Sequence, residues 1–353
     1  MQTLHPNYRN IVVVGASAGG LEAILELVRP LPADLPAAIF IVQHMPPYRV
    51  SRLDAILRDH TALRVETGEN GEEIRPGTIY LPQADRHLLV ENDRLVISKG
   101  PRENRFRPAV DTLFRAAAYA YFERVVGIVL SGALNDGTSG MWTIKRQGGV
   151  AIVQDPAEAA FADMPEGVMR YCEVDYCLPA ARIGELLGTL CRQEIVPAKE
   201  SAALSDRELL QIEIEIAKGR NGLNMGILDH GGASPLTCPE CHGALTQFVE
   251  GKLIRFRCHT GHAHTAESLI TSLRDEVEKT MWELMRGLEE SRLLLERMAD
   301  RLPDGGNDNT AAEYRKSARQ YEQQALQVQR FIRSSDQSDH AMGIKHNSIL
   351  PEA

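Results

Sequence analysis

The sequence has no run of 18 or more apolar residues, so it predicts no membrane-spanning helix. It also lacks an excess of positive charge, because 39 Lys and Arg residues stand against 48 Asp and Glu residues and give a formal net charge of −9. That balance argues against a nucleic-acid-binding protein and against attachment to an anionic membrane by charge. The first ten residues show no signal-peptide pattern, and we therefore expect a cytoplasmic protein.

Cysteine is scarce, with six residues in a chain of 353. Without an export signal these cysteines should stay reduced, so a closely spaced pair favours metal binding over a disulfide. We expect Cys172, Cys177 and Cys191 to pack as small apolar side chains. Hydrophobic residues make up 43% of the chain and charged residues 25%, which excludes a wholly disordered chain, a collagen-like chain and a disulfide scaffold.

Residues 1–192 alternate short apolar runs with helical patterns. Buried strands that alternate with helices are typical of an α/β fold, in which a doubly wound, mainly parallel sheet is covered by helices on both faces. We expect helices over residues 21–28, 49–58 and 110–121, and one that ends near 147. We expect strands over residues 11–14, 38–42, 79–81, 87–90, 94–97, 125–130 and 150–153.

The alternation stops after residue 192. Residues 193–236 contain several glycines and are expected to form a linker with one helix, and residues 237–265 a small zinc-ribbon-like module. Residues 266–334 carry apolar residues at spacings of three and four on both sides of a Pro-Asp-Gly-Gly turn. This pattern predicts an antiparallel helical hairpin or coiled coil. The polar tail, residues 335–353, is expected to be disordered.

A glycine-rich turn between the first strand and the first helix has two interpretations. The run Gly15-Ala-Ser17-Ala-Gly19-Gly20 approaches the G-x-G-x-x-G turn of dinucleotide-binding folds. Ser17, however, replaces the middle glycine that lets the backbone approach a pyrophosphate. Gln43-His44 also stands where such a fold needs an acidic residue for the ribose. We therefore disfavour the dinucleotide interpretation.

The same run also fits G-x-S-x-G, which holds a nucleophilic serine on a sharp strand-to-helix turn. A serine hydroxyl needs a base to take its proton, and that base needs a carboxylate to fix its tautomer. His44 ends the second strand, and Asp136 follows a later strand in Ser131-Gly132-Ala-Leu-Asn-Asp136-Gly. Because open α/β sheets place their sites beyond the carboxyl ends of strands, the sequence predicts a serine hydrolase built on these three residues.

Four motifs resemble, in the same order, those of the CheB-type chemotaxis methylesterases. They are Gly15-Ala-Ser17-Ala-Gly19-Gly20, Gln43-His44-Met45, Arg107-Pro108-Ala109-Val110-Asp111 and Ser131-Gly132-(x)3-Asp136-Gly137. The resemblance covers roughly residues 9–192. It implies hydrolysis of glutamate γ-methyl esters on methyl-accepting chemoreceptors, with release of methanol and without a catalytic cofactor. Ser17 would be the nucleophile, His44 the general base and acid, and Asp136 the orienting carboxylate. Since both reactions share a tetrahedral intermediate, the same site is expected to allow glutamine deamidation.

Two positions depart from the resembled family and bear on the oxyanion and substrate contacts. Family members often have Thr at the position of Ala18 and Met at that of Ala133. The Met position is associated with an oxyanion-stabilising backbone N–H, which Ala133 can still supply. Arg107 is a further candidate, for an acidic receptor segment or the product carboxylate. The family's typical N-terminal receiver domain is not expected here, because the catalytic strand begins at Ile11, so regulation should come from elsewhere.

A second motif has zinc-ribbon spacing. Cys238-Pro-Glu-Cys241 is followed after sixteen residues by Cys258-His-Thr-Gly-His262. Four soft or borderline ligands in two close pairs suit tetrahedral Zn²⁺, and four protein ligands leave no open position, so we expect a structural rather than a catalytic metal. The fourth ligand is open between His262, which we favour because of the tight turn, and the nearby histidines His242, His259 and His264. The segment also resembles the zinc-ribbon-like extension behind some receiver-less CheB-type domains.

The sequence therefore leaves two classes of function to compare. One is a protein-glutamate methylesterase with methylated chemoreceptors as partners and self-association or partner binding through the helical hairpin. The other is a non-catalytic signalling scaffold that docks partners through the zinc module and the hairpin. The complete Ser/His/Asp set favours the enzyme, because a scaffold has no need of all three. Neither class involves nucleic acid or insertion into a membrane.

Overall fold

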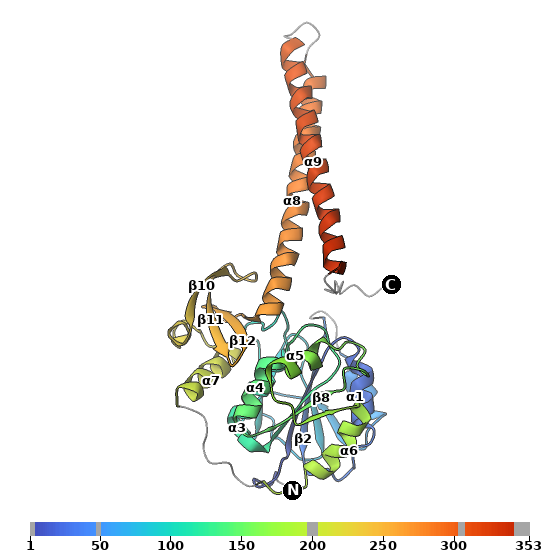
Figure 1. Ribbon diagram of the computed structural model, residues 1–353, viewed down its shortest axis with the longest axis vertical. Helices are drawn as coiled ribbons and strands as arrows, with labels where there is room; N and C mark the ends of the chain where they lie inside the picture. Colours follow the sequence, from blue (N-terminus) through green and yellow to red (C-terminus); the bar gives the residue numbers. More distant parts are fainter. Residues whose placement is uncertain (1–3, 47–50, 196–203, 303–307, 342–353) are drawn as a thin grey trace. The chain divides into compact units, whose positions relative to one another are not determined.

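The computed structural model describes residues 4–46, 51–195, 204–302 and 308–341 (Figure 1). These residues divide into two compact units, Met1–Leu269 and Ile270–Ala353, each of which is described by itself. Among the described residues, no helix combines the length and apolarity that crossing a membrane requires.

The first unit is built on a seven-stranded sheet in which every neighbouring pair of strands is parallel. The strand order is β3-β4-β2-β1-β7-β8-β9. This arrangement confirms the predicted α/β class. The strands are β1 (Ile11–Ala16), β2 (Ala38–Gln43), β3 (Arg64–Thr67), β4 (Thr78–Leu81), β7 (Val125–Val129), β8 (Val150–Gln154) and β9 (Tyr176–Leu178).

Helices cover both faces of this sheet (Figure 1). Because successive strand residues point to opposite faces, Val12 and Val14 of β1 join one core and Ile11 and Val13 join the other. The helices α1 (Gly20–Val28), α2 (Leu53–Arg58) and α6 (Ala180–Leu190) contribute to the first core. The second core receives α3 (Val110–Tyr121), α4 (Thr138–Arg146), α5 (Asp163–Tyr171) and the antiparallel hairpin of β5 (His87–Glu91) and β6 (Arg94–Ser98).

Several helices and strands of the structure were not predicted from the sequence. The predicted series ends at residue 153, whereas the structure continues through α5, β9 and α6. Both sheet edges, β3 and β9, also lack a predicted strand. Edge strands bury less of their surface, so β3 is partly polar and β9 has only three residues, and neither gives a strong apolar signal. The predicted helix at 49–58 begins only at Leu53, and residues 47–50 lie outside the described residues.

The described part of the predicted linker, 193–236, forms regular elements, one of which packs against the first unit's core. It contains α7 (Leu204–Ala217), the short helix η2 (Ile227–His230) and the start of β10 (Gly232–Thr237). Leu210 and Ile214 of α7 are buried in the same core as α3. The helical spacing of these apolar residues explains why this stretch packs against the sheet's helical layer.

A second, four-stranded sheet follows α7 in the first unit. Its order is β10-β11-β12-β13, with β11 (Ala244–Glu250), β12 (Leu253–Cys258) and β13 (Ala263–Thr265), and all its strand pairs are antiparallel. The tight turn between β11 and β12 contains Gly251, with a φ of 61° that favours glycine. We refer to β10–β13 as the C-terminal sheet.

Two long helices, α8 (Ala266–Asp300) and α9 (Asp308–Ala341), account for the second unit and lie side by side (Figure 1). Arg315 of α9 pairs with Asp300 of α8 at 3.3 Å, and Ala318, Ala325 and Ile332 are buried. Helix α9 continues to Ala341, beyond the predicted end of the hairpin at 334, and the remainder of the predicted tail, 342–353, lies outside the described residues.

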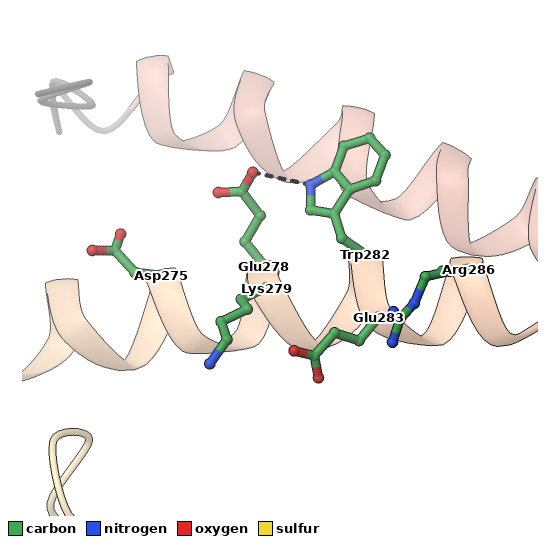
Figure 2. Close-up of a pocket in the computed structure, with 6 residues that line it drawn as sticks. All are labelled: Asp275, Glu278, Lys279, Trp282, Glu283 and Arg286. Atoms are coloured by element: carbon green, nitrogen blue, oxygen red, sulfur yellow. Dashed lines mark hydrogen bonds between the residues drawn. The ribbon is translucent and has the colours of Figure 1, made fainter. Parts of the chain in front are cut away.

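Helix α8 also carries a shallow pocket. Figure 2 shows its lining residues, Asp275, Glu278, Lys279, Trp282, Glu283 and Arg286. The indole Nε1 of Trp282 donates to Glu278 at 3.3 Å, and the Trp282 side chain is 46% exposed. The lining contains no Ser, Cys or His, so this pocket has no nucleophile and base of the kind that the sequence predicts for the active site.

Candidate active site

Ser17 lies in the turn that follows β1. Its backbone N–H donates to the carbonyl of Ser131 at 2.9 Å, and its own carbonyl accepts from Gly20 N–H at 2.9 Å and from Gln43 Nε2 at 2.6 Å. Gly19 has a φ of 67°, in the left-handed region, which lets the chain turn sharply into α1. The turn therefore fixes Ser17 at the start of a helix, as G-x-S-x-G requires.

His44 and Asp136 meet at the same edge of the sheet. The backbone N–H of His44 donates to the carbonyl of Ala16 at 3.0 Å, so β2 delivers His44 beside the end of β1. The His44 ring nitrogen Nε2 lies 2.8 Å from Oδ2 of Asp136. Both side chains are almost completely buried, with exposed fractions of 3% and 0%.

The second ring nitrogen of His44, Nδ1, is the one left for a proton transfer. It is buried and has no hydrogen-bond partner among the described residues, and no hydrogen bond in that part of the chain joins Ser17 to His44. With Nε2 donating to Asp136, Nδ1 is the acceptor of the neutral imidazole. Such an acceptor beside a serine turn is suited to take the proton of the hydroxyl.

Five donors surround the Asp136 carboxylate. Two of them, the backbone N–H groups of Val110 and Asp111, belong to the first turn of α3, where N–H groups have no partner within the helix. Oδ2 accepts from His44 and Val110, and Oδ1 from Asn104, Asp111 and Gly137. The distances are His44 Nε2 2.8 Å, Val110 N 2.7 Å, Asn104 Nδ2 2.9 Å, Asp111 N 3.2 Å and Gly137 N 3.0 Å.

These donors and a second buried carboxyl determine the charge of the site. Burial would raise the pKa of Asp136, but the hydrogen bonds and charge of His44 and the donors Asn104 and Val110 outweigh it and lower that pKa. Asp111 behaves oppositely. Burial and the neighbouring Asp136 charge raise the pKa of Asp111 to about 8. At neutral pH the pair therefore consists of an ionised Asp136 and a protonated Asp111.

Two residues of this site, Asn104 and Phe106, were missed by the sequence analysis. Both lie in the loop before α3. The Phe106 ring stacks on the His44 ring, with 3.6 Å between centroids and an interplanar angle of 9°. Asn104 has a φ of 49° in the structure. The signal available in the sequence was an asparagine, a residue type that tolerates left-handed backbone, close to Arg107-Pro108.

The backbone N–H groups of the two oxyanion candidates, Ala18 and Ala133, make no hydrogen bond among the described residues. Gly132, which precedes Ala133, lies in a tightly packed place. A Cβ added to Gly132 would come within 2.8 Å of Ser17 Cβ and 2.0 Å of Met164 Sδ. Gly132 thus lets the turn that carries Ala133 approach Ser17 closely.

Each of the three guanidinium nitrogens of Arg107 donates a hydrogen bond within the protein. Its Nε and Nη2 donate to Oδ1 of Asp85 at 2.9 and 2.8 Å, and Nη1 donates to the carbonyl of Gly100 at 2.8 Å. These contacts hold the loop before α3 against the turn after β4. They give Arg107 a structural role in this conformation.

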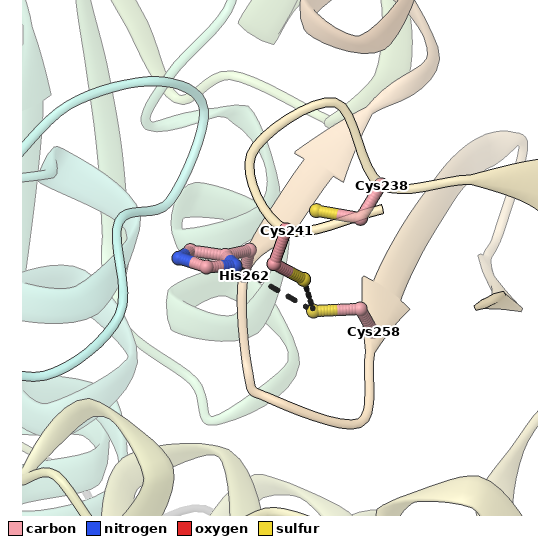
Figure 3. A group of neighbouring side chains, drawn as sticks. All are labelled: Cys238, Cys241, Cys258 and His262. Carbon is pink, nitrogen blue, oxygen red and sulfur yellow. Dashed lines mark hydrogen bonds between the residues drawn. The ribbon is translucent and has the colours of Figure 1, made fainter. Parts of the chain in front are cut away.

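The four predicted metal ligands come together in the C-terminal sheet and its loops (Figure 3). The ligand atoms of Cys238, Cys241, Cys258 and His262 all lie within 4.8 Å of one another. Cys258 Sγ is 3.6 Å from Cys241 Sγ and 3.7 Å from His262 Nδ1. Sulfurs bound to tetrahedral zinc at ~2.3 Å stand about 3.8 Å apart, so the donor set and its spacing fit this metal.

The surroundings of this cluster also fit a metal. A hydrogen bond from Cys238 lowers the pKa of the Cys258 thiol against the opposing effect of burial, which favours the thiolate that binds metals. Of the other candidate histidines, His264 has its Nε2 3.8 Å from Cys238 Sγ. The group that converges, however, contains His262, as the sequence analysis favoured.

Comparison with known proteins bears on the first half of the chain. The family profile described as CheB methylesterase matches residues 12–187. A Leptospira interrogans protein with the provisional name protein-glutamate methylesterase/protein-glutamine glutaminase is 38% identical over 181 residues, which cover 51% of this chain and 93% of that protein. A Thermotoga maritima protein-glutamate methylesterase/protein-glutamine glutaminase is 36% identical over 181 residues, or 50% of this chain and 53% of that protein.

Among solved structures, the crystal structure of the Thermotoga maritima CheB methylesterase catalytic domain is 36% identical to this chain. It matches 51% of this chain and 98% of that domain, with a TM-score of 0.49. The chain belongs to the CheB methylesterase family, a family of carboxylic ester hydrolases. The C-terminal sheet and the two long helices lie outside the matched residues.

Proposed function

We propose that this chain is a protein-glutamate methylesterase that hydrolyses glutamate γ-methyl esters on methylated chemoreceptors. The observation that carries the proposal is the 2.8 Å contact between His44 Nε2 and Asp136, at the strand end beside the Ser17 turn. An ionised, fully buried carboxylate on a histidine with one free nitrogen is the arrangement that activates a serine. The names of the relatives add the substrate class.

In the proposed reaction Ser17 Oγ attacks the γ-carbonyl carbon while His44 Nδ1 takes the hydroxyl proton. The resulting oxyanion accepts hydrogen bonds from the backbone N–H groups of Ala18 and Ala133. The tetrahedral intermediate then collapses, the C–O bond to the methoxy group breaks, and His44 gives its proton to the departing methanol. Asp136 stabilises the imidazolium through Nε2.

Water completes the cycle by the same route. His44 takes a proton from water as the water oxygen attacks the carbonyl carbon of the acyl-enzyme. The C–Oγ bond then breaks and His44 gives its proton to Ser17 Oγ, which frees the glutamate and restores the serine. A glutamine side chain would follow the same path with ammonia as the leaving group, which makes deamidation a second reaction of this site. Neither reaction needs a metal or an organic cofactor.

The Cys238, Cys241, Cys258 and His262 cluster is proposed to bind one structural Zn²⁺. Three thiolates and one imidazole would complete the tetrahedral coordination and leave no position for substrate. The metal would tie the loop before β11 to the loop between β12 and β13. In a sheet this small, metal binding contributes directly to folding.

The helices α8 and α9 are proposed to form an antiparallel coiled coil that binds a partner or a second copy of the chain. Large apolar side chains are exposed along them, among them Leu284, Leu294 and Phe331. Large exposed apolar side chains that gather into a patch mark interaction sites, which supports this proposal. If sedimentation shows the same mass and partner binding for wild type and Leu294→Glu, this surface is not used.

The methylesterase proposal is tested by methanol release from methylated chemoreceptor membranes. Ser17→Ala should lower the rate by about 10⁴-fold or more, because the nucleophile is lost. Ser334→Ala, which changes an exposed serine of α9, is the matched control and should retain the wild-type rate. Equal background rates for wild type and Ser17→Ala, with binding to the receptor intact, would instead favour a non-catalytic scaffold.

A further inference from the structure

The side-chain amide of Asn104 makes every hydrogen bond available to it. Nδ2 donates to Asp136 Oδ1 at 2.9 Å and to Asp111 Oδ2 at 2.8 Å. Oδ1 accepts from the backbone N–H of Thr265 at 2.9 Å and from Ser268 Oγ at 3.0 Å. Asn104 is 3% exposed, so these four bonds replace all its contacts with water.

The contact with Thr265 determines which way the amide faces. A backbone N–H is only a donor, so the atom of Asn104 that meets it must be the oxygen. The nitrogen then faces the two carboxyl groups. Rotating the amide by half a turn would place Oδ1 against Asp136 and Nδ2 against the Thr265 N–H, which leaves buried polar atoms unpaired on both sides.

The two halves of this contact come from different parts of the chain. Asn104 lies within residues 12–187, which match the family, whereas Thr265 ends β13 and Ser268 lies in the first turn of α8, outside that match. The backbone joins the same two segments, because Asn104 N–H donates to the carbonyl of Ala263 at 2.8 Å. The C-terminal sheet thus contacts the loop that also carries Phe106, the residue stacked on His44.

Buried ion pairs hold the C-terminal sheet against this loop. Arg257 of β12 donates to Glu103 at 2.8 Å and to Glu213 of α7 at 3.0 Å. Glu103 also pairs with Arg115 of α3, and Glu213 with Arg255 of β12 at 2.9 Å. Each of these side chains is 3% exposed or less. Because breaking a buried pair is costly, the sheet is firmly attached to the family domain.

We infer that Asn104 is a positioning residue for Asp136, and that the C-terminal sheet and the start of α8 hold it in place through Thr265 and Ser268. The inference rests on the proposed esterase function. It assigns part of the support of the catalytic site to a segment outside residues 12–187, which match the family. Asn104 touches no reacting atom. It holds the Asp136 carboxylate, and Asp136 in turn holds the His44 ring with Nδ1 directed away from the carboxylate.

The inference predicts a loss of turnover rather than of substrate binding. Asn104→Ala should lower kcat for methanol release by about 10- to 100-fold, the usual effect of removing an outer partner of a functional residue, and leave KM within about twofold. Ser268→Ala removes one of two donors to Oδ1 and should lower kcat by about three- to tenfold. Asn224→Ala, an exposed asparagine, and Ser334→Ala are matched controls that should retain the wild-type kcat.

A second measurement does not depend on any ester. In protein with ¹⁵N-labelled histidine, the His44 Nε2–H proton is assigned by its loss in His44→Gln, and its exchange with water is followed by NMR. We expect this exchange to become several-fold faster in Asn104→Ala and in the milder Ser268→Ala, with Asn224→Ala unchanged. Circular dichroism of each variant verifies that it is folded.

The esterase function and the positioning role of Asn104 would be contradicted by different results. Wild-type methanol release no faster than that of Ser17→Ala would overturn the esterase function, while the exchange measurement would still decide the role of Asn104. Unchanged His44 N–H exchange in folded Asn104→Ala and Ser268→Ala would overturn the positioning role. So would a raised KM with unchanged kcat, since that result assigns Asn104 to substrate binding.

Discussion

His44 and Asp136 are separated by 92 positions in the sequence, and their side chains meet at 2.8 Å in the protein interior. The contact depends on the order of the strands, because β1 pairs with both β2, which His44 follows, and β7, which precedes Asp136. The N-terminus of α3 then completes the carboxylate's surroundings with the N–H groups of Val110 and Asp111. Four separate segments therefore build the proposed catalytic triad around one buried carboxylate.

Replacing Asp136 by asparagine should abolish most of the activity. Asp136→Asn keeps the size of the side chain but brings an NH₂ group toward one set of its donors, so the carboxamide cannot hold His44 in the same tautomer. We expect kcat for methanol release to fall by about 10⁴-fold, the cost of the same change in a serine protease. Asp59→Asn, at an exposed position, is the control. A loss below tenfold would mean that Asp136 does not orient the base.

Asp111 should make the stability of the protein depend on pH. Its folded-state pKa is raised to about 8, well above the ordinary value of an aspartic acid, so its contribution to stability is complete below pH ~4 and is lost as the pH rises toward 8. Asp111→Asn removes this titration. We expect the free energy of unfolding in urea to fall less between about pH 5 and pH 8 in Asp111→Asn than in wild type. Identical pH profiles for the two proteins would contradict the protonated state of Asp111.

Removing the metal should destabilise the C-terminal sheet and so lower the thermal midpoint of the protein. Wild-type protein should contain about one zinc per chain, and Cys238→Ser or Cys258→Ser should lower that content and the thermal midpoint. Cys177→Ser is the matched control, because Cys177 is an exposed cysteine outside the cluster. Unchanged zinc content in Cys238→Ser would show that the cluster is not the metal site.

The buried ion pairs of α7 should contribute far more to the free energy of unfolding than the pairs nearer its surface. Glu213 is 3% exposed and contacts Arg255 and Arg257, so Glu213→Gln leaves buried charge uncompensated and should lower the free energy of unfolding by about 3–5 kcal/mol. Glu215, two residues further along the same helix, pairs with Lys218 nearer the surface, and Glu215→Gln should cost about 1 kcal/mol or less. Equal effects in urea unfolding would contradict the buried network.

The general architecture could be predicted because its signals are local. Apolar runs such as the one at Ile11 predict buried strands, and the central strands β1, β2, β7 and β8 appear where those runs lie. The edge strands β3 and β9 did not follow from the pattern, since an edge is defined by what it pairs with rather than by its own composition. The stretch from 193 to 236 was expected to be a linker with one helix because several glycines follow that helix in the sequence. The helix, α7, instead packs in the core through Leu210 and Ile214.

For the candidate site, the sequence by itself determined the chemistry available: a serine on a glycine turn, a histidine and an aspartate after strands, and cysteines at metal-binding spacing. Their catalytic and metal-binding roles stay predictions that the assays above test. Only the tertiary structure decided the partners of these groups, such as Phe106 on His44 and Asn104 on Asp136. The physical reason is the separation along the sequence. A motif is encoded over a few neighbouring residues, whereas Asn104 and Thr265 are 161 positions apart and meet only once both sheets have packed.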